Sequence, residues 1–233
     1  PNHPFAGRDP RMAMTIIYPG MDWNGTVVNT LDKTINGKDN ANYPPSANNA
    51  SKTALTWRKY LDEQYANGIW NTNACPIVIR YAEVLLTYAE AVNELSGPSA
   101  DVYDKLDLIR GRVGMPKVDR EKYASKETLR RLIRRERGVE LAGEGVRRAD
   151  ILRWKDDNGK MVAETVLNGV LERVVGTVNY AETDPTKRAE IDTNAPATDK
   201  KIEDRVFKVH NRYNPIPQGA IDNNPNLEQN PGY

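Results

Sequence analysis

The spacing of apolar residues changes near position 76 and divides the chain into segments of different character. Residues 1–76 carry Pro, Gly or Asn every few positions, and only residues 13–18 and 54–60 have the short apolar runs typical of strands. From residue 77 to 155, apolar residues recur every three or four positions, which indicates amphipathic helices. The pattern therefore predicts a mainly α fold with long irregular loops and minor short strands.

The first two predicted helices form a hairpin. Gly97 and Pro98 end the first helix, and the second begins near Ala100 and ends near Gly114. Such a short connection predicts antiparallel packing, as in a tetratricopeptide-type unit. On the first helix, the spacing predicts one broad apolar face, made of Val78, Tyr81, Leu85, Tyr88, Val92 and Leu95 and widened by Ala82, Leu86 and Ala89. On the second helix, the residues predicted to face it are Val102, Leu106, Ile109 and Val113.

A third helix is predicted from Ser125, a favourable N-cap residue, to about Gly143. Its apolar stripe also carries Glu136 and Glu140, and carboxylates on a buried face need partners. Paired carboxylates can also bind metal or act as an acid and a base, but arginines are abundant nearby and structural ion pairs are the favoured interpretation. The candidate arginines are Arg80, Arg110, Arg112, Arg147 and Arg148.

The remaining sequence predicts less regular structure. Residues 147–155 indicate a fourth short helix, and residues 161–173 a fifth. A polar stretch over 176–204 is followed by a strand-like run at 206–213. The last residues repeat Asn-Pro three times, which predicts a nonhelical tail.

Composition excludes several classes of protein. The 233 residues include 33 Lys and Arg against 32 Asp and Glu, so the net charge of +1 argues against nucleic-acid binding. No apolar run approaches the ~18 residues of a transmembrane helix. One Cys and two His leave no disulfide framework and no His-rich metal site, and we expect Cys75 to be a buried free thiol.

No catalytic motif stands out in the sequence. It contains no phosphate-binding loop, no H-E-x-x-H, no G-x-S-x-G and no C-x-x-C. We therefore expect no catalytic residue, no metal and no cofactor.

Aromatic residues in the loop-rich segment are the candidate ligand-binding residues. Of the 17 aromatic residues in the chain, only two are Phe, so nearly all carry a polar tip. Flat rings among Asn-rich loops suit a carbohydrate or a peptide, because the ring covers an apolar face while amides bond to polar groups. Considered singly, each ring is expected to serve packing more often than binding. The candidates are Trp23, Tyr43, Trp57, Tyr60, Tyr65 and Trp70.

Several segments resemble one family in its order along the chain. They are residues 8–11 (RDPR), 15–20 (TIIYPG), 79–91 (IRYAEVLLTYAEA), 108–110 (LIR), 114–116 (GMP), 129–150 (LRRLIRRERGVELAGEGVRRAD), 152–154 (LRW), 214–217 (NPIP) and 224–233 (NPNLEQNPGY). Together they resemble the SusD/RagB family of Bacteroidota outer-membrane lipoproteins.

The resemblance implies a SusD-like fold and a function. Members are non-catalytic nutrient-binding proteins on the extracellular face of the outer membrane, which capture a glycan or a peptide and deliver it to a SusC-like TonB-dependent transporter in polysaccharide utilization. It also implies a structural role for Glu144 and Asp150 beside Glu136, Glu140, Arg80, Arg110 and Arg147. Two alternatives remain open at this point: a glycan- or peptide-hydrolysing enzyme, and a tetratricopeptide-type scaffold that binds only protein.

The resemblance also implies a division of the chain. Residues 1–233 would be the C-terminal portion of a single domain, with a ligand-facing segment (1–76), a helical core (77–155) and an excursion with the C-terminal tail (156–233). The N-terminal half, with earlier helices and a lipid anchor as the only membrane attachment, would lie outside this chain. A lone helical hairpin needs such neighbours to bury its faces, so that half is an expected partner.

Overall fold

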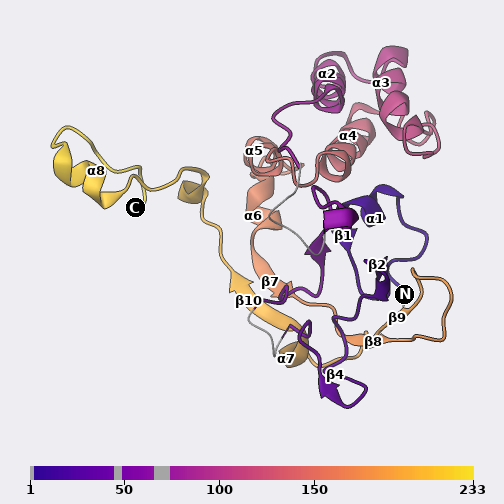
Figure 1. Ribbon diagram of the computed structural model, residues 1–233. Helices are drawn as coiled ribbons and strands as arrows, with labels where there is room; N and C mark the ends of the chain where they lie inside the picture. Colours follow the sequence, from indigo (N-terminus) through magenta and orange to yellow (C-terminus); the bar gives the residue numbers. More distant parts are fainter. Residues whose placement is uncertain (1–2, 45–48, 66–73) are drawn as a thin grey trace. The chain divides into compact units, whose positions relative to one another are not determined.

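A computed structural model describes residues 3–44, 49–65 and 74–233 (Figure 1). The chain divides into two compact units. Unit 1 comprises Pro1–Arg147 and Arg173–Lys200, and unit 2 comprises Arg148–Glu172 and Lys201–Tyr233. Among the described residues, no helix is long and apolar enough to cross a membrane.

The main core of unit 1 lies among α2 (Tyr81–Ser96), α3 (Ala100–Gly111) and α4 (Lys126–Glu140). Helix α2 packs against both of the others, as Figure 1 shows. The largest fully buried side chains at this junction are Leu86, Leu106, Leu129 and Ile133. Burial of each such side chain contributes roughly 1.5–3 kcal/mol, so this junction is a major source of stability. The predicted antiparallel hairpin and third helix are confirmed.

Local sequence explains where these helices begin and end. The Ser99 and Ser125 hydroxyls cap α3 and α4 by accepting the backbone N–H groups of Val102 and Thr128. Gly97 follows α2 at a φ of 80°, a left-handed conformation that glycine adopts without steric cost.

The predicted buried face of the first helix is wrong in part. Val78 precedes α2 and is 92% exposed, and Tyr81 and Leu95 are 71% and 84% exposed. The buried face contains Leu85, Leu86 and Ala89 of the predicted face, together with Glu90 and Asn93. The sequence is apolar over such a wide arc that spacing alone did not select a face, and the partners α3 and α4 decide which part is covered.

The loop-rich part of unit 1 contains α1 (Arg11–Thr15), η1 (Glu63–Tyr65) and several two-residue strands. The strand pairs are β1 (Ile16–Ile17) with β6 (Thr56–Trp57), β2 (Asp22–Trp23) with β3 (Thr26–Val27), and β4 (Thr34–Ile35) with β5 (Lys38–Asp39). A second core lies here, where Phe5 stacks on Tyr18 with 4.7 Å between ring centroids. The two predicted strands are thus confirmed in much shorter form, and residues 11–15 form a helical turn instead.

Residues 176–191 complete this second core. Strands β8 (Gly176–Val178) and β9 (Ala189–Ile191) pair antiparallel, and α7 (Ala197–Lys200) follows. A Cβ at Gly176 would lie 2.1 Å from the Glu190 carbonyl oxygen, so only glycine permits this close strand pair. Val178 and Ala189 are buried against the loop segment, which joins regions far apart in sequence.

Unit 2 contains α5 (Arg147–Arg153, whose first residue belongs to unit 1), α6 (Val162–Val166), β7 (Gly169–Glu172), β10 (Lys201–Arg205), η3 (Val209–Arg212) and α8 (Gln218–Asn223). Its small core consists of Ile151, Met161, Ala163 and Phe207. The fourth predicted helix is confirmed. The helix predicted over 161–173 is wrong beyond Val166, because Gly169 begins a strand that pairs with β10.

Two further predictions for unit 2 are corrected by the structure. Residues 206–213 do not form a strand, since β10 ends at Arg205 and Val209–Arg212 form a 3-10 turn. The tail includes the short helix α8, which begins directly after Pro217. Proline has no backbone N–H, and N–H groups at the start of a helix have no acceptor within the helix. Proline is therefore compatible with a helix start, although it disrupts a helix interior.

Candidate ligand-binding site

Trp57 presents a flat ring to solvent from the loop-rich part of unit 1. It lies on β6 opposite Ile16, and its side chain is part of a residue that is 55% exposed. The indole covers Gly143, where a Cβ would lie 3.4 Å from Cζ3. Gly143 has a φ of +77°, so both the backbone and the contact favour glycine. The ring is therefore supported on one side and open on the other.

Trp23 lies close to the same strand through Arg58. The Arg58 guanidinium carbon is 5.1 Å from the centroid of the Trp23 ring, a cation–π contact. The same guanidinium donates to the Ala13 carbonyl oxygen at 2.8 Å, which fixes its position. Arg58 also donates its backbone N–H to Thr15. Trp23 therefore contacts Arg58, the residue that follows Trp57 along the chain.

Backbone strain flanks Trp57 on both sides. Ala54 has a φ of 66° and Tyr60 a φ of 73°, which is unusual for residues with a side chain. Such conformations cost of order 1–3 kcal/mol each and persist only where the surroundings impose them. Here Lys59 provides the restraint: its Nζ donates to the Ala142 carbonyl oxygen at 2.9 Å and pairs with Glu144. The half-buried Tyr60 is therefore held beside the Trp57 strand.

The other sequence candidates are not joined to this region. Tyr43 is half-buried below Arg173, whose guanidinium carbon is 5.5 Å from its ring centroid. Tyr65 ends η1, and its side chain is outside the described part of the structure, as is all of Trp70. Cys75 is exposed, so the prediction of a buried thiol is wrong.

The glutamates of the third predicted helix lie in a cluster of ion pairs. Arg11 donates to Glu136 at 2.8 Å and to Glu140 at 2.9 Å, and Arg80 pairs with Glu140 and Glu144 at 2.7 Å. The side chains of these three glutamates are at most 3% exposed. Arg110 pairs with Glu136 and Arg112 with Glu140. We call this set, with Asp9 and Lys59, the anchor cluster.

Electrostatics keep the anchor cluster charged. Burial opposes ionisation of Glu140, but hydrogen bonds from Arg80 and Arg11 hold its pKa below the usual value. Burial likewise opposes the charge on Glu144, and Arg80 and Lys59 lower its pKa. Burial disfavours the Arg11 cation too, yet its bonds to Asp9, Glu136 and Glu140 raise its pKa. These glutamates are therefore anionic partners of arginines.

Two predicted members of the ion-pair set lie elsewhere, and three members of the anchor cluster, Asp9, Arg11 and Lys59, were not predicted. Arg147 lies beside Gly138, and Asp150 is buried in unit 2 and pairs with Arg153 at 2.8 Å. Arg11 and Lys59 come from the loop segment, 125 and 85 residues from their partners Glu136 and Glu144. The only available signal for Arg11 was the charged string at residues 8–11.

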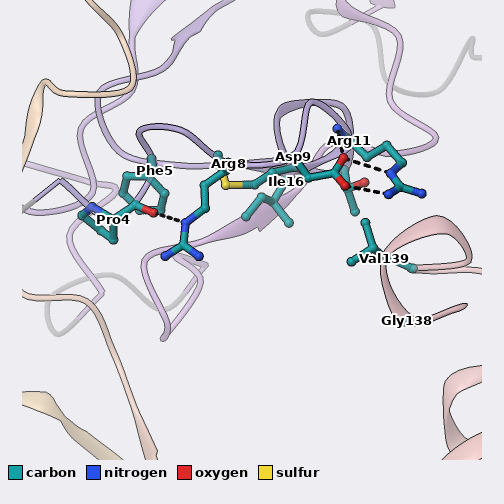
Figure 2. A pocket seen from close by; sticks show the side chains of 11 residues that line it. Pro4, Phe5, Arg8, Asp9, Arg11, Ile16, Gly138 and Val139 are labelled. Carbon is teal, nitrogen blue, oxygen red and sulfur yellow. Dashed lines mark hydrogen bonds and ion pairs between the residues drawn. The ribbon is translucent and has the colours of Figure 1, made fainter. Parts of the chain in front are cut away.

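A pocket of about 510 Å³ lies next to the anchor cluster (Figure 2). Residues of α1 and the preceding turn form one side, and the C-terminal part of α4 forms the other. The residues that line it are mainly apolar: Pro4, Phe5, Arg8, Asp9, Arg11, Met12, Thr15, Ile16, Gly138, Val139 and Ala142. Cross-strand partners project from the same face of a ladder, so Ile16 in the pocket wall and Trp57 share a face.

Comparison with known proteins decides the family. The sequence model of the SusD family matches residues 1–233. This chain belongs to the SusD family. The SusD-like protein P25 of Formosa agariphila is 34% identical to it over 154 residues, which are 61% of this chain and 29% of that protein. The family resemblance seen in the sequence is confirmed.

Solved structures show the same SusD-like fold. A SusD-like protein from Bacteroides fragilis superposes with a TM-score of 0.71 at 25% identity, over 98% of this chain and 39% of that chain. A SusD homolog from Bacteroides thetaiotaomicron gives a TM-score of 0.56 at 22% identity, over 97% of this chain and 41% of that chain. The mainly α SusD-like fold is thus confirmed, and this chain spans well under half the length of these relatives.

The described residues contain no group of three His, Cys, Asp or Glu side chains placed to hold a metal ion. The described part of this SusD-family chain offers a ligand the exposed indole of Trp57, the Arg58 guanidinium and an apolar pocket.

Proposed function

We propose that this chain is the C-terminal part of a non-catalytic protein that captures a glycan nutrient at the cell surface. Family membership supports the class of protein. The observation that supports the site is the Trp57 ring, which packs on Gly143 with one face and is exposed on the other. A sugar ring places its apolar C–H face on an indole while its hydroxyl groups bond to nearby amides and charged groups. A peptide ligand would use the same ring for an apolar side chain.

We further propose delivery of the captured ligand to a SusC-like TonB-dependent transporter at the extracellular face of the outer membrane. A lipid anchor outside these residues would hold the protein there. Binding and release would then be the whole task of the protein, and energy would come from the transporter. The anchor cluster supports a structural role for Glu136 and Glu140, because each is committed to at least two arginines.

The N-terminal half of the longer protein is a proposed partner. Helix α2 and the residues before it expose a continuous set of large apolar side chains, at Val78, Ile79, Tyr81, Val84, Tyr88 and Leu95. Exposed apolar surface of this kind is typical of a face that is covered by further structure. More than half of the length of the relatives lies outside the match, which supports the proposal that further structure covers this face.

Calorimetric titration with a panel of oligosaccharides and peptides tests the proposed function. Trp57→Ala should weaken binding of the preferred ligand at least fivefold, since loss of a stacked ring costs about 1–3 kcal/mol. Tyr213→Ala removes an aromatic residue of similar exposure from unit 2 and is the matched control. Equal affinities for the wild type, Trp57→Ala and Trp23→Ala would contradict the assignment of this site. Turnover of a ligand that stops on one carboxylate-to-amide change would instead favour an enzyme.

A further inference from the structure

Arg8 is a fixed but uncompensated cation at the edge of the pocket. Its Nε donates to the Pro4 carbonyl oxygen at 2.5 Å, which holds the guanidinium in place without neutralising it. Among the described residues, neither terminal nitrogen of Arg8 has a hydrogen-bond or ion-pair partner. In Figure 2, Pro4, Phe5 and Arg8 lie at one end of the pocket, and Gly138 and Val139 at the other.

The acidic residue beside Arg8 cannot serve as its counter-ion. Both carboxylate oxygens of Asp9 accept from Arg11, at 2.6 Å and 2.9 Å for the side-chain nitrogens. Arg11 lowers the pKa of Asp9, so the carboxylate is charged and already paired. Within the described structure, the anchor cluster sets five cationic side chains against four carboxylates. Of the charged residues that line the pocket, Asp9 and Arg11 pair with each other, and Arg8 adds a positive charge.

The rest of the pocket suits the body of a ligand. Its volume of about 510 Å³ lies within the roughly 300–1,000 Å³ typical of small-molecule sites. Met12, Ile16, Val139 and Ala142 are half-buried and give an apolar lining, with one hydroxyl from Thr15. The wall continues through the β1–β6 ladder toward the Trp57 face, so a chain of sugar units on Trp57 could place a neighbouring unit in the pocket.

We propose that this pocket is a subsite for a glycan unit with an anionic substituent, a uronate carboxylate or a sulfate ester, which pairs with the terminal nitrogens of Arg8. A guanidinium matches both groups because its paired N–H donors reach two oxygens at once. The apolar face of the same sugar unit lies on Met12, Ile16 and Val139. The proposal rests on the proposed glycan-binding function and narrows its ligand to acidic glycans.

Matched probes that differ only in charge test the subsite in the intact protein. The uronate arm compares trigalacturonate with its methyl ester, and the sulfate arm compares neocarrabiose 4-sulfate with neocarrabiose. We expect at least one charged probe to bind about five- to tenfold more tightly than its neutral form, because hydrogen bonds to charged groups are stronger than those between neutral groups and solvent screens only part of that gain. The advantage should shrink as salt is added.

Substitutions test whether Arg8 causes the tighter binding of the charged probe. Arg8→Gln should remove it, whereas Arg120→Gln, an exposed arginine that does not line the pocket, changes the net charge equally and should preserve it. Val139→Phe should block the pocket, and Ala142→Leu is the milder alternative if that variant does not fold. Circular dichroism and thermal unfolding report folding.

Three outcomes overturn the subsite: equal binding of charged and neutral probes, equal effects of Arg8→Gln and Arg120→Gln, or no binding of any charged probe at millimolar concentration. Neutral glycan binding that depends on Trp57 but shows no charge preference would leave the proposed function standing and reject only the subsite. No binding of any glycan in the wider panel would contradict the proposed function itself.

Discussion

At the scale of single residues, Gly143 couples backbone geometry to the exposed ring of Trp57. Its φ of +77° disfavours any side chain, and the indole occupies the space beside its Cα. Gly145 offers a close comparison, because it has a φ of +81° but nothing within 4 Å of a Cβ. The two glycines share the same backbone demand, and only one of them touches the candidate site.

This pair gives a residue-scale prediction. Gly143→Val and Gly145→Val should each lower the free energy of unfolding, by about 1–2 kcal/mol from the left-handed backbone. Only Gly143→Val should also displace the indole, which we expect to weaken ligand binding and change tryptophan fluorescence. Urea unfolding, fluorescence and calorimetry measure the three effects. Equal fluorescence and binding in both variants would show that Gly143 does not support Trp57.

The sequence alone predicts which residues need a charged partner better than it predicts which residues supply that partner. That Glu136 and Glu140 need cationic partners follows from carboxylates on an apolar stripe. The identity of Arg11 and Lys59 as partners does not follow, because the contact joins residues more than 80 positions apart. Likewise, loop composition makes Trp57 and Tyr43 equal candidates. Only the fold shows that the exposed Trp57 ring packs on Gly143, whereas the Tyr43 ring lies below Arg173.

At the scale of elements, the anchor cluster attaches the loop segment to α4. Glu140 accepts from Arg11 of α1 as well as from Arg80 and Arg112 of the helical core. A buried carboxylate with several arginines is costly to break, since removing its charge leaves cations without a partner. The loop-rich segment therefore depends on Glu136 and Glu140 of α4, whose carboxylates are committed to arginines.

Replacement of Glu140 tests this attachment. Glu140→Gln should lower the free energy of unfolding by about 3–5 kcal/mol at pH 7, the range found when one partner of a buried pair is removed. Glu121→Gln changes an exposed carboxylate and should alter stability by less than about 0.5 kcal/mol. Chemical unfolding of both variants measures the difference, and similar losses would refute the structural role.

The same glutamates predict how stability depends on pH. In the folded state the pKa values of Glu140 and Glu144 lie below the ordinary 4.5, because arginines and Lys59 outweigh the effect of burial. Their contribution is therefore complete above the unfolded-state pKa and is lost as the pH falls through the folded-state values. We expect the free energy of unfolding to drop between about pH 5 and pH 3, with a smaller drop in Glu140→Gln. A pH-independent stability over this range would contradict the prediction.

Element boundaries show what periodicity can and cannot predict. The caps at Ser99 and Ser125 and the stop at Gly97 are local, so the sequence locates α3, α4 and the end of α2. The buried face of α2 depends on its neighbours, so the spacing alone selected exposed residues such as Tyr81 and Leu95. In unit 2, β7 pairs with β10 and replaces the helix that the spacing predicts after Val166. The sequence around Val166 does not reveal this pairing, because the partner strand lies about thirty residues away.

At the scale of the whole molecule, the exposed apolar side chains of α2 limit the stability of residues 1–233 when these residues stand alone. Stacked helical units bury their faces against neighbours, and an isolated unit exposes them to water. We expect residues 1–233 alone to unfold at low denaturant with poor cooperativity, and to be stabilised within the longer protein. Urea titration of the two forms, followed by circular dichroism, measures this. A steep two-state transition of residues 1–233 alone would count against the proposed N-terminal partner.

Arg11 and Lys59 also bracket most of the loop-rich segment. Each is tied to α4 or to the turn after it, through Glu136, Glu140 and Glu144. The intervening residues 12–58, which contain Trp23 and Trp57, are therefore attached at both ends to α4 and the turn that follows it. Such an arrangement behaves as an exchangeable cassette: a relative's segment, grafted between the same two cations, would bring a new ligand preference onto an unchanged helical base.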